Sequence, residues 1–168
     1  MLQNKINLTP EVTTEGPFKG RKPLFELTLN NIVTRTKKNS MEIHYNWRKD
    51  AKRCPVCKRP YNSWPAQSKQ SRAFEAEMKS KISALLPDDY AVPTVPLTLV
   101  WESYIDYQPR KGIDISNVIS ALDDAAKELL FADDDWSHVK SHRGSQIGYD
   151  HDNPHIVLRA YAYDPEQD

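Results

Sequence analysis

The sequence has no long apolar run and little cysteine. None of its 168 residues belongs to a stretch of the roughly 18 apolar residues that a membrane helix needs. No signal-peptide pattern opens the chain. Hydrophobic residues make up 39% and charged residues 27% of the composition, which is typical of a soluble protein. We therefore expect one intracellular domain with a normal core and no membrane association.

Cysteine occurs only as Cys54 and Cys57, in the motif Cys-Pro-Val-Cys. This spacing is that of half a zinc knuckle, but zinc needs four ligands and the sequence has no second cysteine pair. His44 or a second subunit are the candidates for completing a structural Zn²⁺ site. The alternative is a turn that carries two reduced thiols. A redox pair is disfavoured because the motif does not open a helix after a strand.

The net charge is zero, but the two halves of the chain have opposite signs. Residues 1–81 hold 17 Lys or Arg against 7 Asp or Glu, a balance of +10, and residues 82–168 hold 6 against 16, a balance of −10. A basic half suits phosphates and an acidic half suits cations, a division that a metal-dependent nuclease requires. The alternative is that the two halves pair with each other in the fold.

The first part of the chain predicts a flexible arm and two short strands. Residues 1–23 contain three prolines, two glycines and few periodic apolar positions. The alternation in residues 24–29 predicts a strand, and residues 41–47 predict a second one. Residues 34–40 carry three cations and several small hydrogen-bonding side chains, which suits either a phosphate contact or a solvated turn.

The middle of the chain predicts an exposed excursion and then a helix. Residues 48–67 surround the cysteine pair and are rich in Lys, Arg, Pro and aromatics. Tyr61 and Trp64 are candidates either for stacking on unpaired bases or for pinning this loop to the domain. From a cap at Ser68 the pattern becomes helical. The predicted core residues of this helix are Phe74, Met78, Ile82 and Leu85.

The second half of the chain completes an α+β pattern. Residues 96–107 predict a strand, and residues 136–142 and 155–163 predict a final antiparallel pair. The order is strand, strand, helix, strand, helix, strand, strand. This order predicts a single α+β domain over residues 24–168, in which two main helices pack on a small mixed β-sheet.

A helix that begins at Asp114 gathers carboxylates along one edge. At 100° per residue its apolar face consists of Val118, Leu122, Ala125, Ala126, Leu129 and Leu130. One border of that face carries Asp114, Asn117, Asp124 and Glu128, and the opposite side carries Ser116, Ser120, Asp123 and Lys127. The acidic triplet 133–135 follows the helix. Such carboxylates repel one another unless a cation such as Mg²⁺ neutralises them, so this stretch predicts a metal site. The alternative is that Asp114 is an N-cap and the other acidic residues are solvated.

Three blocks of sequence resemble the RusA family of Holliday junction resolvases. They are Thr36-Lys37-Lys38-Asn39-Ser40, Pro65-Ala66-Gln67-Ser68-Lys69 with Arg72-Ala73-Phe74-Glu75, and Asp114-Ile115-Ser116-Asn117 with Asp134-Asp135. A fourth block, His142-Arg143-Gly144-Ser145-Gln146 with Tyr149-Asp150, resembles a phage-type branch of that family. The blocks follow the family's order and span most of residues 24–163.

The resemblance implies a homodimeric, Mg²⁺-dependent endonuclease that resolves Holliday junctions or other branched DNA in recombination and repair. Mn²⁺ is the expected substitute metal. It also implies a RusA-like fold and a location in the cytoplasm of a bacterial or phage-infected cell. A four-way junction is recognised mainly by shape and phosphates, which a symmetric dimer can contact with two equivalent faces.

The resemblance also assigns roles to individual residues. Asp114 and Asp135 correspond to catalytic metal ligands, with Asp134 beside them, and Asp124 is the extra carboxylate that compensates for Ser116 at the family's second Asp. Ser120 stands where the family has a lysine. The residues expected to contact DNA are Lys37, Lys38, Arg110, Lys111 and Asn117.

Two other functions remain open on the sequence alone. The replacements at Ser116 and Ser120 are also compatible with a junction-binding protein that no longer cleaves DNA. A small zinc-stabilised interaction module unrelated to DNA is the third interpretation. Cleavage of labelled junctions separates the first two, and zinc content together with a lack of preference for branched DNA identifies the third.

Overall fold

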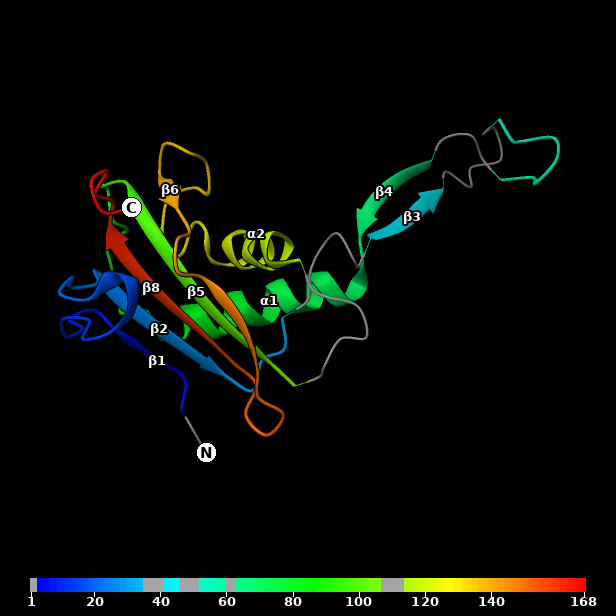
Figure 1. Cartoon of the computed structure of the whole chain (residues 1–168). Helices are drawn as coiled ribbons and strands as arrows, with labels where there is room; N and C mark the ends of the chain where they lie inside the picture. Colours follow the sequence, from blue (N-terminus) through cyan, green and yellow to red (C-terminus); the bar gives the residue numbers. More distant parts are fainter. Residues whose placement is uncertain (1–2, 35–40, 46–51, 60–62, 107–113) are drawn as a thin grey trace.

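The computed structural model describes residues 3–34, 41–45, 52–59, 63–106 and 114–168 (Figure 1). Its strands are β1 (Lys5–Asn7), β2 (Phe25–Asn30), β3 (Met41–Tyr45), β4 (Ser63–Gln67), β5 (Leu97–Ile105), β6 (Val139–Ser141), β7 (Gln146–Tyr149) and β8 (His155–Ala162). Its helices are the short 3₁₀ helix η1 (Gly16–Phe18), α1 (Lys69–Ser83) and α2 (Ile115–Ala126).

Six strands form one mixed sheet. Its order is β1-β2-β8-β5-β6, and β7 also pairs with β5. β5 is antiparallel to β8 and parallel to β6 and β7. With two helices packed on this sheet, the predicted α+β class is confirmed.

The predicted antiparallel pairing of residues 136–142 with residues 155–163 is wrong. β8 lies between β2 and β5, and β6 instead pairs with β5. Ile156, Leu158 and Ala160 of β8 are fully buried in the core. An edge position beside the three-residue strand β6 would leave these side chains in water, so burial of apolar surface places β8 in the centre.

The edge of β5 that faces away from β8 pairs with two short strands and has one side-chain partner, the hydroxyl of Ser145. β6 pairs with β5 at Leu97 and Thr98, and β7 pairs with it from Glu102 to Ile105. Between these two segments, the Trp101 N–H donates to Ser145 Oγ at 3.0 Å. The backbone of β5 therefore has hydrogen-bonding partners on this edge near both ends of the strand and at Trp101 between them.

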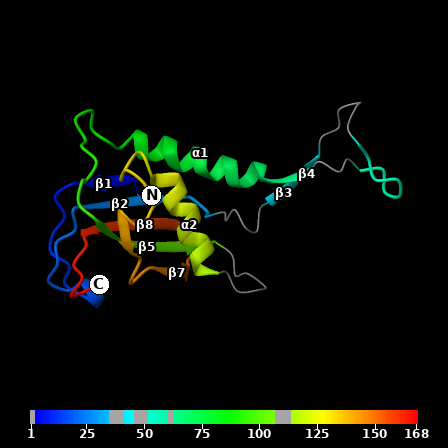
Figure 2. The same cartoon turned by 90° about the horizontal axis from the view of Figure 1, so that it is seen from above.

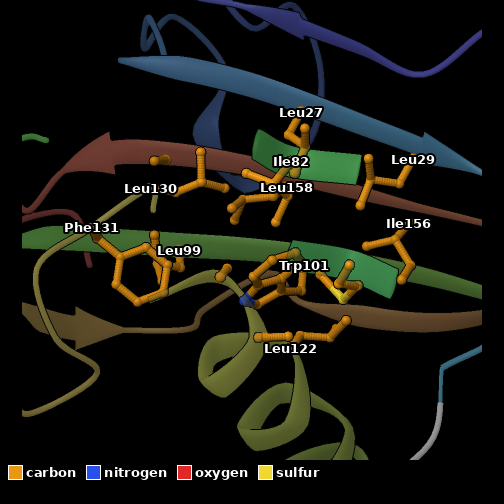
Figure 3. Close-up of a cluster of buried hydrophobic side chains, with 14 of the residues drawn as sticks. Leu27, Leu29, Ile82, Leu99, Trp101, Leu122, Leu130, Phe131, Ile156 and Leu158 are labelled. Carbon is orange, nitrogen blue, oxygen red and sulfur yellow. The ribbon is translucent and has the colours of Figure 1, made fainter. Parts of the chain in front are cut away.

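Both helices cover the same face of the sheet. Alternate residues of the strands point into a core shared with the two helices, as Figure 3 shows for Trp101 of β5 beside Leu122 of α2. The labelled members of this core are Leu27, Leu29, Ile82, Leu99, Trp101, Leu122, Leu130, Phe131, Ile156 and Leu158. Within the described ranges, neither helix combines the length and the apolar character needed to cross a membrane.

α1 forms as the helical pattern predicts. Ser68 is its N-cap, and the Ser68 side chain accepts a hydrogen bond from Ser71 N at 3.2 Å. Phe74, Met78 and Ile82 recur every four residues and are buried against the sheet. The sequence therefore determines where this helix starts and which face it buries.

α2 is shorter than the periodicity suggests. The helix ends at Ala126 because Lys127 takes an extended backbone with ψ at 155°. Glu128 follows with a positive φ of 69°, so it does not share a helical border with Asp114. Leu130 comes after the helix and is nevertheless buried, because the turn after α2 folds back under the core.

Residues 3–23 do not form the loosely packed arm that the sequence predicts. β1 pairs antiparallel with β2, and Phe18 is 3% exposed, with its ring stacked 4.6 Å from that of Tyr161. Arg21 also forms an ion pair of 2.7 Å with Asp168. The prolines and glycines that suggested an arm shape a loop that covers one apolar patch of the sheet, so the domain includes this segment.

β3 and β4 form a second, two-stranded sheet that stands apart from the six-stranded one. We call this pair, with the turn of residues 52–59, the hairpin. In both views it extends beyond the start of α1, away from the sheet (Figures 1 and 2). The first strand was predicted, whereas β4 lies in the region expected to be an irregular excursion.

Candidate functional site

Asp114 caps the N-terminus of α2. Its backbone is extended, and its Oδ1 accepts hydrogen bonds from Ser116 N at 3.0 Å and from Ser116 Oγ at 2.6 Å. The capping role considered from the sequence is confirmed. Ser116 therefore donates to the first carboxylate of the motif, where the resemblance expects a second carboxylate. Asn117 is half-buried, and its N–H donates to Asp114 O at 3.1 Å.

A lysine joins two carboxylates at the other end of α2. Lys127 Nζ lies 3.3 Å from Asp124 Oδ1 and 3.1 Å from Asp134 Oδ1. Asp124 is ten residues from Asp114 along a helix, which corresponds to about 15 Å. Asp124 is therefore too far away to take the place of the missing carboxylate at Ser116.

The contacts within this cluster shift the pKa values of its members. The hydrogen bond to Asp134 raises the pKa of Lys127, and the contact with Asp124 adds to that effect although burial opposes it. Burial acts to raise the pKa of Asp134, but hydrogen bonds involving Lys127 and Asp133 outweigh it and hold that pKa below its usual value. Lys127 therefore pairs with both carboxylates at neutral pH.

Asp135 accepts several hydrogen bonds from the residues that follow it. Its Oδ1 lies 2.5 Å from Ser137 Oγ, 2.9 Å from Ser137 N and 3.0 Å from His138 Nδ1. The bonds from Ser137 and then His138 hold the pKa of Asp135 well below its ordinary value. Asp135 is exposed, so this carboxylate is ionised and reaches solvent.

The structure does not bring the predicted metal ligands together in one chain. Asp114 caps the start of α2, whereas Asp134 contacts Lys127 directly after its end, and a helix of 12 residues spans about 18 Å. Among the described residues, which include all three aspartates, no group of three His, Cys, Asp or Glu side chains can hold a metal ion. The expected Mg²⁺ pocket of Asp114, Asp134 and Asp135 is therefore not met within a single chain.

Asp123 is the buried carboxylate that the helical pattern placed on the solvent side. It is 4% exposed, and its Oδ1 accepts a hydrogen bond of 2.7 Å from Trp101 Nε1. His142 Nε2 lies 2.8 Å from the other oxygen, an ion-pair distance, although its direction does not meet hydrogen-bond geometry. The buried face of α2 therefore includes Asp123 in addition to the predicted apolar residues, because the segment containing His142 covers this side of the helix.

Trp136 is a surface aromatic that the sequence interpretation did not single out. It is 79% exposed, and Lys140 Nζ lies 4.0 Å from the centre of its ring. Large aromatic side chains are usually buried, and an exposed ring beside a cation is a common nucleic-acid contact. Its position directly after the acidic triplet was visible in the sequence and could have drawn attention to it.

Four of the predicted DNA contacts lie outside the described residues. These are Lys37 and Lys38 in the loop after β2 and Arg110 and Lys111 before α2. Their assignment to DNA therefore stays a prediction from the sequence. The side chains of His44, Tyr61 and Trp64 also fall outside the part of the chain whose side chains the structure describes.

The two cysteines lie in a closed turn of the hairpin. Cys54 N donates to Arg59 O at 2.9 Å, and Lys58 N donates to Cys54 O at 3.0 Å. Both cysteines are free thiols, half-buried at Cys54 and exposed at Cys57. Hydrogen bonds from the backbone of Cys57 and Val56 and from the Cys57 thiol lower the pKa of Cys54.

A cleft of about 730 Å³ opens on the opposite face of the sheet. Within it, Arg159 Nε lies 2.7 Å from Glu26 Oε2, and Arg159 Nη1 lies 2.6 Å from Glu102 Oε1. The N-terminal segment around η1 forms its outer wall. None of the residues predicted to be catalytic lines this cleft, and its Arg159 pairs with Glu26 and Glu102.

No family model matches the sequence, and no curated protein matches it.

Proposed function

We propose that this protein is a homodimeric, metal-dependent endonuclease that acts on branched DNA, as its resemblance to the RusA family implies. The observation that carries the proposal is the position of the two expected catalytic aspartates. Asp114 and Asp135 are both exposed; Asp114 caps the start of α2, and Asp135 follows Asp134, which contacts Lys127 just after the end of that helix. Exposed carboxylates of this kind are among the ligands that Mg²⁺ prefers.

A two-fold dimer offers a way to unite these aspartates. A two-fold axis perpendicular to α2 reverses the direction of the second copy, so the two helices run antiparallel. The start of one helix then faces the end of the other. We therefore propose that Asp114 of one protomer acts with Asp135 of the partner subunit, which gives two equivalent sites per dimer. Two sites match the two strands that resolution of a four-way junction must cut.

Cleavage of a labelled four-way junction tests the enzymatic proposal. We expect symmetric nicking in Mg²⁺ or Mn²⁺ and none in a chelator. Asp114→Asn or Asp135→Asn should lower the nicking rate by more than about 100-fold, since even residues that only orient metal ligands contribute 10–100-fold. Binding should remain or strengthen, because each variant removes negative charge near phosphates. Normal cutting by either variant would show that the ligand assignment is wrong.

Mixing the two inactive variants tests the shared site. A heterodimer of Asp114→Asn and Asp135→Asn chains has one site with both substitutions and one site with neither. We expect the mixture, after unfolding and refolding together, to regain nicking. The matched control mixes Asp114→Asn with the double variant Asp114→Asn, Asp135→Asn, in which every site is damaged. If the wild type cuts and the first mixture stays as inactive as this control, each site belongs to one chain.

A junction-binding protein without cleavage is the second candidate. It is favoured by the ion pairs of Lys127 with Asp124 and Asp134, which offset part of the charge of these carboxylates without a metal, and by Ser116 in place of an aspartate. It predicts salt-sensitive binding to junctions with no nicking in either metal. The cleavage assay therefore decides between the two candidates, whereas binding alone does not.

A further inference from the structure

The hairpin is a small unit that stands apart from the main sheet. β3 and β4 pair only with each other, and the six-stranded sheet does not include them. Figures 1 and 2 show it extending beyond the start of α1. A two-stranded hairpin is at best marginally stable in water. A small unit of this kind is commonly held together by a disulfide or a metal ion.

The turn between these strands has the shape of a metal-binding knuckle. The hydrogen bonds between Cys54 and Arg59 and between Lys58 and Cys54 close the backbone into a tight loop. Lys58 has a positive φ of 61°, which reverses the chain directly after the second cysteine. Both cysteines of this loop are free thiols, half-buried at Cys54 and exposed at Cys57. Two thiols three residues apart in one tight turn are suited to bind one cation.

Charge around the turn also favours a thiolate metal site. A zinc ion with four cysteine thiolates carries a net charge of about −2, since each thiolate contributes −1. Lys52, Arg53, Lys58 and Arg59 flank the two cysteines and offset such a charge. Cysteine thiolates prefer zinc among the common divalent metals that show no redox chemistry.

The described part of one chain supplies two zinc ligands, Cys54 and Cys57. A structural zinc ion takes four, and within the described residues no third His, Cys, Asp or Glu side chain joins Cys54 and Cys57. Val56, between them, is 88% exposed, so the face of the turn is open to another molecule. A second copy of the same turn provides the two missing ligands in a symmetric arrangement.

We propose that Cys54 and Cys57 of two chains bind one Zn²⁺ ion, which joins two hairpins tip to tip. On binding, each of the four thiols releases its proton to solvent and the zinc ion loses its bound water. The resulting link is independent of the nuclease proposal, because the hairpin tip contains none of the proposed catalytic aspartates.

Metal stoichiometry of the full-length protein tests this site. We expect protein purified without chelator to contain one zinc ion per two chains. Titration of the reduced, metal-free chain with Co²⁺ should give the visible bands of tetrahedral thiolate cobalt, with an endpoint at one cobalt per two chains. Cys54→Ser and Cys57→Ser should each abolish the bands. Val56→Ala is the matched control and should keep both the bands and the endpoint.

Three outcomes would overturn the proposal. An endpoint of one cobalt per chain would place all four ligands in a single chain. Absence of zinc and of thiolate bands would leave the turn without a metal, and an iron chromophore in the purified protein would show that the metal is not zinc. The wild-type endpoint decides the question even if the serine variants fail to fold. Junction cleavage is measured in parallel, and its result does not change the interpretation of the stoichiometry.

Discussion

At the scale of single residues, hydrogen bonds from nearby backbone and hydroxyl groups hold the proposed catalytic carboxylates in place. Asp114 accepts from Ser116, and Asp135 accepts from Ser137 and His138. In both cases a serine two residues later donates through its N–H and its hydroxyl. The same local arrangement therefore fixes each aspartate in its turn and keeps an acceptor oxygen at the surface.

Ser137→Ala tests the cause of the low pKa of Asp135. This variant removes the hydroxyl donor, so the pKa of Asp135 should rise toward its ordinary value of about 3.9. In the wild type the folded-state pKa is depressed, so the associated stability is present above about pH 3.9 and is lost as the pH falls toward the folded-state value. Carboxyl-carbon NMR titration measures the shift. Ser120→Ala is the control, and an unchanged Asp135 pKa in Ser137→Ala would contradict the assignment.

Asp123→Ala should destabilise the fold. The substitution leaves the buried Trp101 Nε1 donor without its partner, which costs about 1–3 kcal/mol. Asp124→Ala, one residue further on, removes a partly exposed ion pair with Lys127 and should cost about 0–1 kcal/mol. Urea unfolding of both variants gives the comparison. Equal losses of stability would mean that the bond between Trp101 and Asp123 contributes no more than a surface pair.

At the scale of elements, α1 is fixed by its buried stripe. Met78 is fully buried between Phe74 and Ile82, so Met78→Ala should lower the free energy of unfolding by about 2–5 kcal/mol. Ser80→Ala, on the exposed side of the same helix, should change it by less than about 0.5 kcal/mol. Denaturant midpoints of the two variants check this difference. A small effect at Met78 would show that the core refills the space.

Elements that depend on local signals could be predicted from the sequence. The cap at Ser68 and the spacing of Phe74, Met78 and Ile82 define α1, and Asp114 starts α2 as its capping chemistry requires. The alternation of polar and apolar residues likewise indicated the strands that became β2, β5 and β8. These features depend on residues only a few positions apart.

Features that depend on distant partners could not be predicted in this way. β1 forms because Lys5–Asn7 meet β2, and the burial of Asp123 depends on Trp101 and on the segment of His142. The sequence predicted one helical border for Asp114 and Asp124, but Asp114 caps the helix with an extended backbone and lies about 15 Å from Asp124 along the helix axis. The proposed site therefore needed the fold, and the shared site that we infer needs a second chain.

At the scale of the whole molecule, the charge asymmetry of the sequence predicts salt-dependent DNA binding. Replacement of Lys37 and Lys38 together by Ala should weaken binding to four-way junctions and lower the slope of log K against log salt by about 1 for each lysine. Fluorescence anisotropy at several salt concentrations measures the slope. Lys5→Ala, on the exposed side of β1, is the control. An unchanged slope in the double variant would exclude these lysines from the DNA interface.

The strands that pair with β5 also affect the tendency of the protein to aggregate. β5 is the longest and one of the most apolar strands, and a bare edge on such a strand would recruit strands from other molecules and promote aggregation. The segments of β6 and β7, with the Ser145 hydroxyl between them, occupy that edge. The segments between α2 and β8 thus protect the protein from self-association through β5.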